Sequence, residues 1–125
     1  MFTLMWSTRR MAVTRLSGPD GRLEFTLDGL TFYRSESGAS ARGTGRVHQV
    51  EWVRVIGAEV TWSLKGRPVV RIAVRGAPVV SRHQRDPHAM RVKSKHADRA
   101  HEFVDLVNEE VRLHGRWGRG EIGFG

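Results

Sequence analysis

The sequence predicts an α+β protein, mainly β, in which about seven antiparallel strands form a barrel or sandwich capped by one C-terminal α-helix. Two observations predict this fold class. Short strand-like segments extend from Arg22 to about Ser94, and an amphipathic helical pattern covers Ala97 to His114. A chain of 125 residues is long enough for one domain that buries a modest core without metals or disulfides.

The first hairpin is predicted between residues 22 and 34. Its first half alternates apolar and polar residues, which is the two-residue period of a half-buried strand. Asp28-Gly29 is typical of a two-residue type I′ turn. With that turn, the apolar side chains of both strands share one face in the pairs Leu27–Leu30 and Phe25–Phe32.

Residues 35–45 (SESGASARGTG) are rich in small residues and are predicted to form a mobile loop. Gly38 and Gly43 have the spacing of a phosphate-binding loop. However, Thr44-Gly45 follows where that motif needs Lys-Ser/Thr, and no helix is expected after it. A nucleotide site is therefore not predicted here, because the lysine and the helix N-terminus carry its chemistry.

The strand pattern resumes at Arg46 and loses its period near Glu51-Trp52, which predicts a bend. Residues 59–64 then alternate cleanly, with three side chains expected to face the core: Val60, Trp62 and Leu64. After a turn at residues 65–67, the next strand is expected to point Val70, Ile72 and Val74 inward. Two weaker strands are predicted at 78–81 and 89–94.

The C-terminal helix is predicted over Ala97–His114. Its apolar stripe covers about 120° of the helix surface and contains Ala97, Ala100, Phe103, Val104, Val107 and Val111. Ser94 is expected to cap its start, and Gly115 is expected to end it. Leu106 and Leu113 lie off the stripe. They are either ordinary exposed leucines or a contact for a partner.

Both ends of the chain are interpreted as flexible, with the domain between them at residues 21–114. Residues 1–20 form a basic N-terminal arm in this interpretation, and its apolar run is too short for a signal peptide. Residues 115–125 form a glycine-rich tail. The tail also holds large apolar residues, which either pack on the domain or bind another chain: Trp117, Ile122 and Phe124.

Four stretches define the order of the predicted elements: GRLEFTLDGLTFYR, VHQVEWVRVIGAEVTW, RPVVRIAVRG and AHEFVDLVNEEV. Together they resemble the pleckstrin-homology (PH) superfold, particularly bacterial PH-like domains, over about residues 21–114. The resemblance implies two nearly orthogonal antiparallel sheets with the C-terminal helix plugging one open end. Phosphoinositide-binding PH domains usually carry a basic signature across the first hairpin. The tip of that hairpin here is Asp28-Gly29, so the familiar inositol-phosphate site is not expected.

The net charge of +8 is concentrated in residues 65–95, where nine Lys and Arg residues accompany one acidic residue, Asp86. The candidate anion-binding residues are Lys65, Arg67, Arg71, Arg75, Arg91 and Lys93. Such a surface attracts nucleic-acid phosphates, anionic lipid headgroups or an acidic protein. The simpler interpretation is a solvated strand face that discourages edge pairing. Because this stretch has no aromatic residue, binding of single-stranded nucleic acid by base stacking is not expected.

The residue types give no positive sign of catalysis or of a metal site. Cysteine is absent, which excludes disulfides, thiol nucleophiles and Cys-based zinc sites. His96 and His101 are five residues apart, about 140° on a helix, and so do not share one face. No serine lies in a G-x-S-x-G context. We therefore expect no enzyme, no cofactor and no metal.

Two functional hypotheses follow. The first is a non-catalytic PH-like interaction domain that binds a protein partner or self-associates, with Leu106, Leu113 and Trp117 as contacts and a free strand edge near 58–75. The alternative is a peripheral anion binder of lipid headgroups or nucleic-acid phosphates through residues 65–95. No apolar run reaches the ~20 residues of a transmembrane helix. The lack of cysteine fits the cytoplasm.

Overall fold

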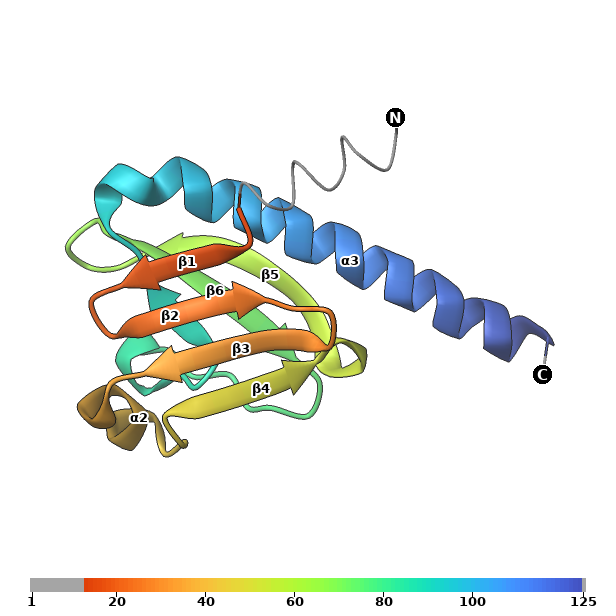
Figure 1. Cartoon of the computed structure of the whole chain (residues 1–125), viewed down its shortest axis with the longest axis horizontal. Helices are drawn as coiled ribbons and strands as arrows, with labels where there is room; N and C mark the ends of the chain where they lie inside the picture. Colours follow the sequence, from red (N-terminus) through yellow and green to blue (C-terminus); the bar gives the residue numbers. More distant parts are fainter. Residues whose placement is uncertain (1–12, 125) are drawn as a thin grey trace.

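A computed structural model of the chain describes residues 13–124, with side chains for residues 13–114. Seven strands form two antiparallel sheets (Figure 1). The first sheet has the order β1-β2-β3-β4, with the bounds β1 Arg15–Gly18, β2 Gly21–Phe25, β3 Gly29–Arg34 and β4 Val47–Glu51. The second has the order β5-β6-β7, with β5 Val55–Trp62, β6 Pro68–Val74 and β7 Ala89–Arg91. The sheets do not close into a barrel, so the predicted mainly β fold class is confirmed as a sandwich.

Within residues 13–124, two α-helices and three short 3₁₀ turns connect and cover the sheets. They are α2 (Glu36–Arg42), η1 (Trp52–Arg54), η2 (His83–Arg85), η3 (Ser94–His96) and α3 (Ala97–Phe124). Figure 1 shows the first sheet in front of the second, with α3 along one side of both. Within the described residues, no helix has both the length and the apolar character needed to span a bilayer.

The core lies between the two sheets and beneath α3. Its fully buried side chains come from all three layers and include Leu23, Leu30, Phe32, Val70, Met90, Phe103 and Val107. The apolar stripe predicted for the helix is confirmed, because Ala100, Phe103, Val104 and Val107 are buried in this core. The bend predicted near Glu51-Trp52 is also confirmed, since the turn η1 separates β4 from β5.

The first hairpin forms as predicted, but its register is wrong by two residues. The observed pairs are Phe25–Leu30 and Leu23–Phe32. A longer loop replaces the type I′ turn, and it is closed by the Thr26 N–H, which donates to the Gly29 carbonyl at 2.8 Å. An even shift keeps every side chain on its predicted face. It moves Leu27 out of the strand, where its side chain is 90% exposed.

Gly29 is required for a different reason from the one predicted. It lies opposite Glu51 of β4, and a Cβ at Gly29 would overlap the carbonyl of Val50. The close approach of β4, rather than a tight turn, therefore selects glycine at this position.

The folded domain begins earlier than predicted. Residues 15–18, assigned from the sequence to a flexible arm, form β1 and pair with β2. Leu16 lies opposite Leu23, and the side chains of Val13 and Leu16 are buried in the core. The arm prediction is wrong for these residues because the strand is too short for its period to be visible. Residues 1–12 lie outside the described part of the chain.

The loop predicted at residues 35–45 is wrong, since its central residues form α2. The Ser35 hydroxyl accepts a hydrogen bond from the Gly38 N–H at 3.1 Å, and Gly43 ends the helix in a left-handed conformation with φ 67°. These are ordinary helix caps. They outweigh the low helix propensity of the glycine and serine residues.

Three further boundaries differ from prediction. Gly115 does not end α3, which continues to Phe124. Ser94 does not cap α3 but begins the turn η3, for which no side-chain cap forms. Residues 78–81 form no strand. The count of seven strands holds because β1 takes the place of that segment.

Leu23 and Leu27 offer a matched test of the hairpin register. We expect Leu23→Ala to lower the free energy of unfolding by about 2–5 kcal/mol, because it leaves a cavity in the core. Leu27→Ala should lower it by less than about 0.5 kcal/mol, because that side chain is in solvent. Urea unfolding measures both. Equal losses would contradict the observed register.

Candidate functional site

A buried ion network joins the start of the first sheet to α2. The Asp20 carboxylate, between β1 and β2, accepts a hydrogen bond from Arg42 Nη2 at 2.6 Å and lies 3.7 Å from Arg34 Nη1. The two arginine side chains are only 2% and 1% exposed, respectively. Arg34 also lies over the ring of Phe32, at 4.8 Å from its centroid. One carboxylate therefore balances two cations that have left solvent.

The same two arginines hold the segment between β6 and β7. Arg42 donates to the carbonyls of His83 at 3.1 Å and Asp86 at 3.0 Å. Arg34 donates to the carbonyl of Ala89 at 2.6 Å. Burial lowers the pKa of Arg34 to about 10, and the charge of Arg42 acts in the same direction. The group nevertheless remains a cation at neutral pH.

Arg71 of β6 holds the other end of this segment. It donates to the carbonyls of Val80 at 2.8 Å and Ser81 at 2.6 Å, and it pairs with the Asp86 carboxylate at 3.0 Å. Guanidinium groups present several donors in a rigid plane, so three of them constrain a loop strongly. Residues 80–87 are thus positioned by side chains rather than by strand pairing.

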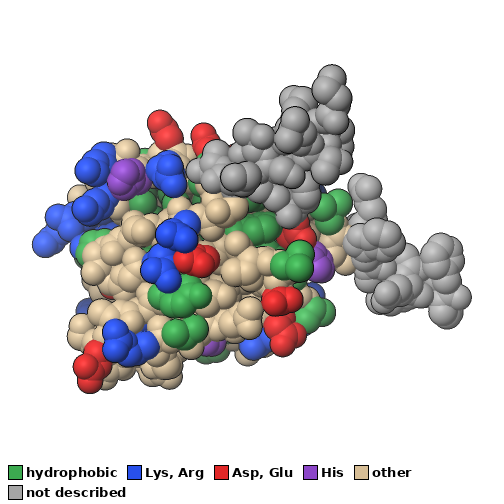
Figure 2. All heavy atoms as spheres, viewed as in Figure 1, with side chains coloured by type: hydrophobic (Ala, Val, Ile, Leu, Met, Phe, Trp, Pro, Cys, Tyr) green, Lys and Arg blue, Asp and Glu red, His purple; other side chains and the backbone are tan. Residues whose placement is uncertain are grey.

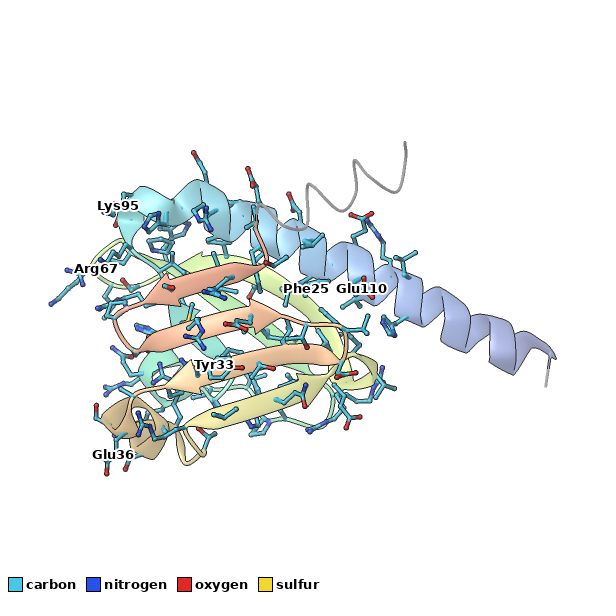
Figure 3. All side chains as sticks on the ribbon, in the orientation of Figure 1. Phe25, Tyr33, Glu36, Arg67, Lys95 and Glu110 are labelled. Carbon is cyan, nitrogen blue, oxygen red and sulfur yellow. The ribbon has the colours of Figure 1, made fainter. Side chains whose placement is uncertain are left out.

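A basic groove lies between this segment and the β5–β6 hairpin. It has a volume of about 760 Å³, and the cations that line it are Lys65, Arg71, Arg82, Arg85 and Arg91. Among the described residues that line the groove there is no Asp or Glu. Arg71 pairs with Asp86, which does not line the groove. The other four cations share a lining whose described residues include no acidic side chain. Figure 2 shows Lys and Arg side chains gathered at the end of the molecule where Figure 3 labels Arg67 and Lys95.

The tip of the β5–β6 hairpin forms one wall of the groove. Three hydrogen bonds shape it, from Ser63 N–H to Arg67 O, Gly66 N–H to Ser63 O and Arg67 N–H to Ser63 Oγ. Gly66 takes the left-handed conformation that this turn requires, with φ 74°. The tip is therefore a defined turn that presents its other side chains to solvent.

Trp62 and Leu64 were predicted to face the core, and that prediction is wrong. Trp62 is 57% exposed and Leu64 is fully exposed, whereas Val60 is half-buried. The alternation is real, but Trp62 lies at the end of the edge strand β5 and is exposed there, although its cross-strand partner Pro68 is buried. A two-residue period reports which side of a strand a residue is on and not where the opposite sheet ends. Both residues line the groove instead.

The six residues predicted to bind anions are only partly brought together. Lys65, Arg71 and Arg91 line the groove, and Arg67 lies in the adjoining turn. Arg75 follows the opposite end of β6, and Lys93 precedes η3, so neither contributes to the lining. The groove residues that were not named as candidates include Trp62, Leu64, Arg82 and Arg85, although Arg82 and Arg85 belong to the basic stretch 65–95. Only a contact map could have found them, because the charge count does not distinguish neighbours in space.

The residues predicted to contact a partner are also separated. Leu106 is 3% exposed and belongs to the buried residues, so its prediction as an exposed contact is wrong. Leu113 is 36% exposed. Trp117 lies on α3, but its side chain is outside the described residues.

The strand edge predicted near residues 58–75 is not free along its length. Asn108 of α3 accepts from the Ala58 N–H at 2.8 Å and donates to the Ala58 carbonyl at 3.0 Å. These are the backbone groups that an added strand would use. Residues 68–74 form β6, which is the central strand of its sheet. The helix therefore occupies part of the expected docking edge.

A histidine pair links β4 to the residue before β7. The Nε2 atoms of His48 and His88 lie 3.1 Å apart, so one ring donates a hydrogen bond to the other. Burial, the charge of His48 and two arginines lower the pKa of His88 to about 4, despite the opposing effect of Asp86. Burial and the same arginines, Arg34 and Arg54, lower the pKa of His48. In the described part of the chain, no third His, Cys, Asp or Glu joins the pair as a metal ligand.

This pair predicts a loss of stability in mild acid. The folded pKa of His88, about 4, lies below the ordinary value of 6.5, so the unfolded chain takes up its proton first. The stabilisation is complete above about pH 6.5 and is lost as the pH falls towards about 4. Urea unfolding at about pH 7 and about pH 5 should show a larger loss for the wild type than for His88→Gln. The exposed His101→Gln should behave as the wild type, and an unchanged pH dependence in His88→Gln would contradict the assignment.

Comparisons with family models, with curated proteins and with solved structures give no match to this chain. The function is therefore inferred from the groove and the elements that position it.

Proposed function

We infer that this chain is a non-catalytic, PH-like interaction domain that binds a phosphate-bearing anion in the basic groove. One observation carries this proposal. Besides Arg71, four cations line a groove whose described residues include no Asp or Glu, and the loop that carries two of them, Arg82 and Arg85, is held in place by three other arginines. These are Arg34, Arg42 and Arg71. If Arg82 and Arg85 only made the surface soluble, their loop would not need to be held in place by other arginines.

The order of elements supports the PH-like part of the proposal. A four-stranded antiparallel sheet is followed by a three-stranded one and then by a C-terminal helix on one side of the sandwich. The first long hairpin carries Asp28 in its loop and no basic cluster. The cations lie at the β5–β6 hairpin and the following loop instead.

The chemistry of the groove suits phosphate. Guanidinium groups bind phosphate oxygens through paired, charge-assisted hydrogen bonds, and Arg82 and Arg85 are both exposed and available for them. Because these contacts are close to solvent, binding should weaken as the salt concentration rises. We also place the domain in the cytoplasm, since the chain contains no cysteine.

The double variant Arg82→Glu with Arg85→Glu tests the groove, with inorganic pyrophosphate as the probe in titration calorimetry. We expect the wild type to bind pyrophosphate and the variant to lose at least about tenfold in affinity, because attraction becomes repulsion. Arg71 is unsuitable for this test, since its ion pair with Asp86 supports the loop.

The matched control is Arg54→Glu with Arg112→Glu, which changes the net charge equally at two exposed positions outside the groove. The control should retain most of the wild-type affinity. If both double variants weaken binding equally, the effect is one of net charge and the groove is not the site.

We propose protein binding or self-association through α3 as a second candidate function. The specific observation in its favour is that α3 projects past the sandwich (Figure 1). Leu113, near the end of the part of α3 whose side chains are described, is exposed. We propose that the part of α3 that projects past the sandwich contacts another chain.

Leu113→Asp tests this second candidate. In light-scattering measurements of mass on the full chain, we expect an oligomer in the wild type and a lower mass in the variant, because a charge would enter an apolar contact. Leu27→Asp is the control, since that side chain is exposed in the β2–β3 loop. A monomeric wild type would contradict self-association.

A further inference from the structure

We propose that the β5–β6 hairpin docks the domain on an anionic lipid bilayer, with Leu64 and Trp62 inserted among the lipids and the groove holding their phosphate headgroups. The inference rests on the proposed function and identifies the source of the phosphate. It adds a surface and a mode of contact that phosphate binding by itself does not require.

The first observation is the pair of apolar side chains at the tip. Leu64 is fully exposed, and Trp62, two residues before it, is 57% exposed. The turn between Ser63 and Arg67 has its own backbone hydrogen bonds, which define the position of Leu64 at the tip of the hairpin. Two large apolar side chains this close together in the sequence at one tip would be buried by contact with an apolar phase.

The second observation is the arrangement of charge around the tip. Lys65 and Arg67 lie in the turn itself, and Arg82, Arg85 and Arg91 line the groove that the turn borders. This combination of residue types suits a bilayer. Leucine prefers the hydrocarbon, tryptophan the interface, and Lys and Arg the headgroup phosphates.

The apolar tip also favours a bilayer over nucleic acid. Trp62 could stack on a base, but an aliphatic side chain such as Leu64 lacks the π-face that base stacking uses. A soluble phosphate compound would engage the cations and leave both apolar residues in water. An anionic lipid surface uses the apolar tip and the cations together.

The contact is expected to be reversible. Each Lys or Arg near an anionic surface strengthens binding by about fivefold. One short apolar insertion alone anchors a protein weakly, so both signals are needed together. Figure 1 shows the C-terminal end of α3 at the opposite end of the molecule from Arg67, which Figure 3 labels beside the hairpin. A docked domain would therefore leave the projecting part of α3 free.

The test is co-sedimentation of the full chain with phosphatidylcholine vesicles, with or without about one third phosphatidylglycerol. We expect binding only to the anionic vesicles and a loss of about tenfold in the partition coefficient for Leu64→Ser. Leu27→Ser is the matched control, because Leu27 is equally an exposed leucine in a hairpin loop, and it should bind as the wild type does.

The two proposals fail in different ways. If Leu64→Ser binds anionic vesicles as the wild type does, insertion is overturned while the groove remains an anion site. Leu64→Ser should also unfold in urea at the wild-type midpoint, because the side chain is fully exposed, which shows that the variant has folded. If the wild type binds neither pyrophosphate nor vesicles, the proposed function fails as well. Salt-sensitive binding to duplex DNA without binding to vesicles would overturn the bilayer and assign the groove to nucleic acid.

Discussion

The carboxylate of Asp20 is the interaction on which most of this structure depends. It lies in the turn between the first two strands and pairs with Arg42 at the end of α2, and it is close to Arg34 at the end of β3. Both guanidinium groups then extend to backbone carbonyls beyond β6. Without the carboxylate, two buried cations would lose their nearest acidic partner, at a cost of several kcal/mol. One acidic residue thus allows arginine to connect the two sheets.

The arginines of this chain therefore divide into two kinds that composition cannot distinguish. Arg34, Arg42 and Arg71 are used by the fold, because each donates to carbonyls of the segment between β6 and β7. Arg82 and Arg85 lie on that segment and face solvent. The first group determines where the second group is presented. A high net charge is in this way partly structural and partly available for a ligand.

The two ends of the molecule have different characters. At one end, an ordered turn presents Trp62 and Leu64 beside the cations of the groove. At the other, α3 projects beyond the sandwich (Figure 1). The side of the second sheet between them is closed to strand addition at Ala58, because Asn108 satisfies its backbone groups. Contacts with other molecules are therefore best placed at the ends rather than along that edge.

The sequence by itself determined the fold class, the inward faces of β2, β3, β6 and α3, and the bend after β4, because each of these follows from a local period or a local break in it. Tertiary structure decided the hairpin register, the strand nature of residues 15–18 and the burial of Leu106, since these depend on which surface lies opposite. It also decided the site. Trp62 keeps the side predicted by its alternation, but at the end of an edge strand it is exposed. Arg82 and Arg85 line the same groove as Arg91 because the side chains of Arg42 and Arg71 hold the loop that carries them. A local pattern shows which way a side chain points, whereas only packing shows what it meets there.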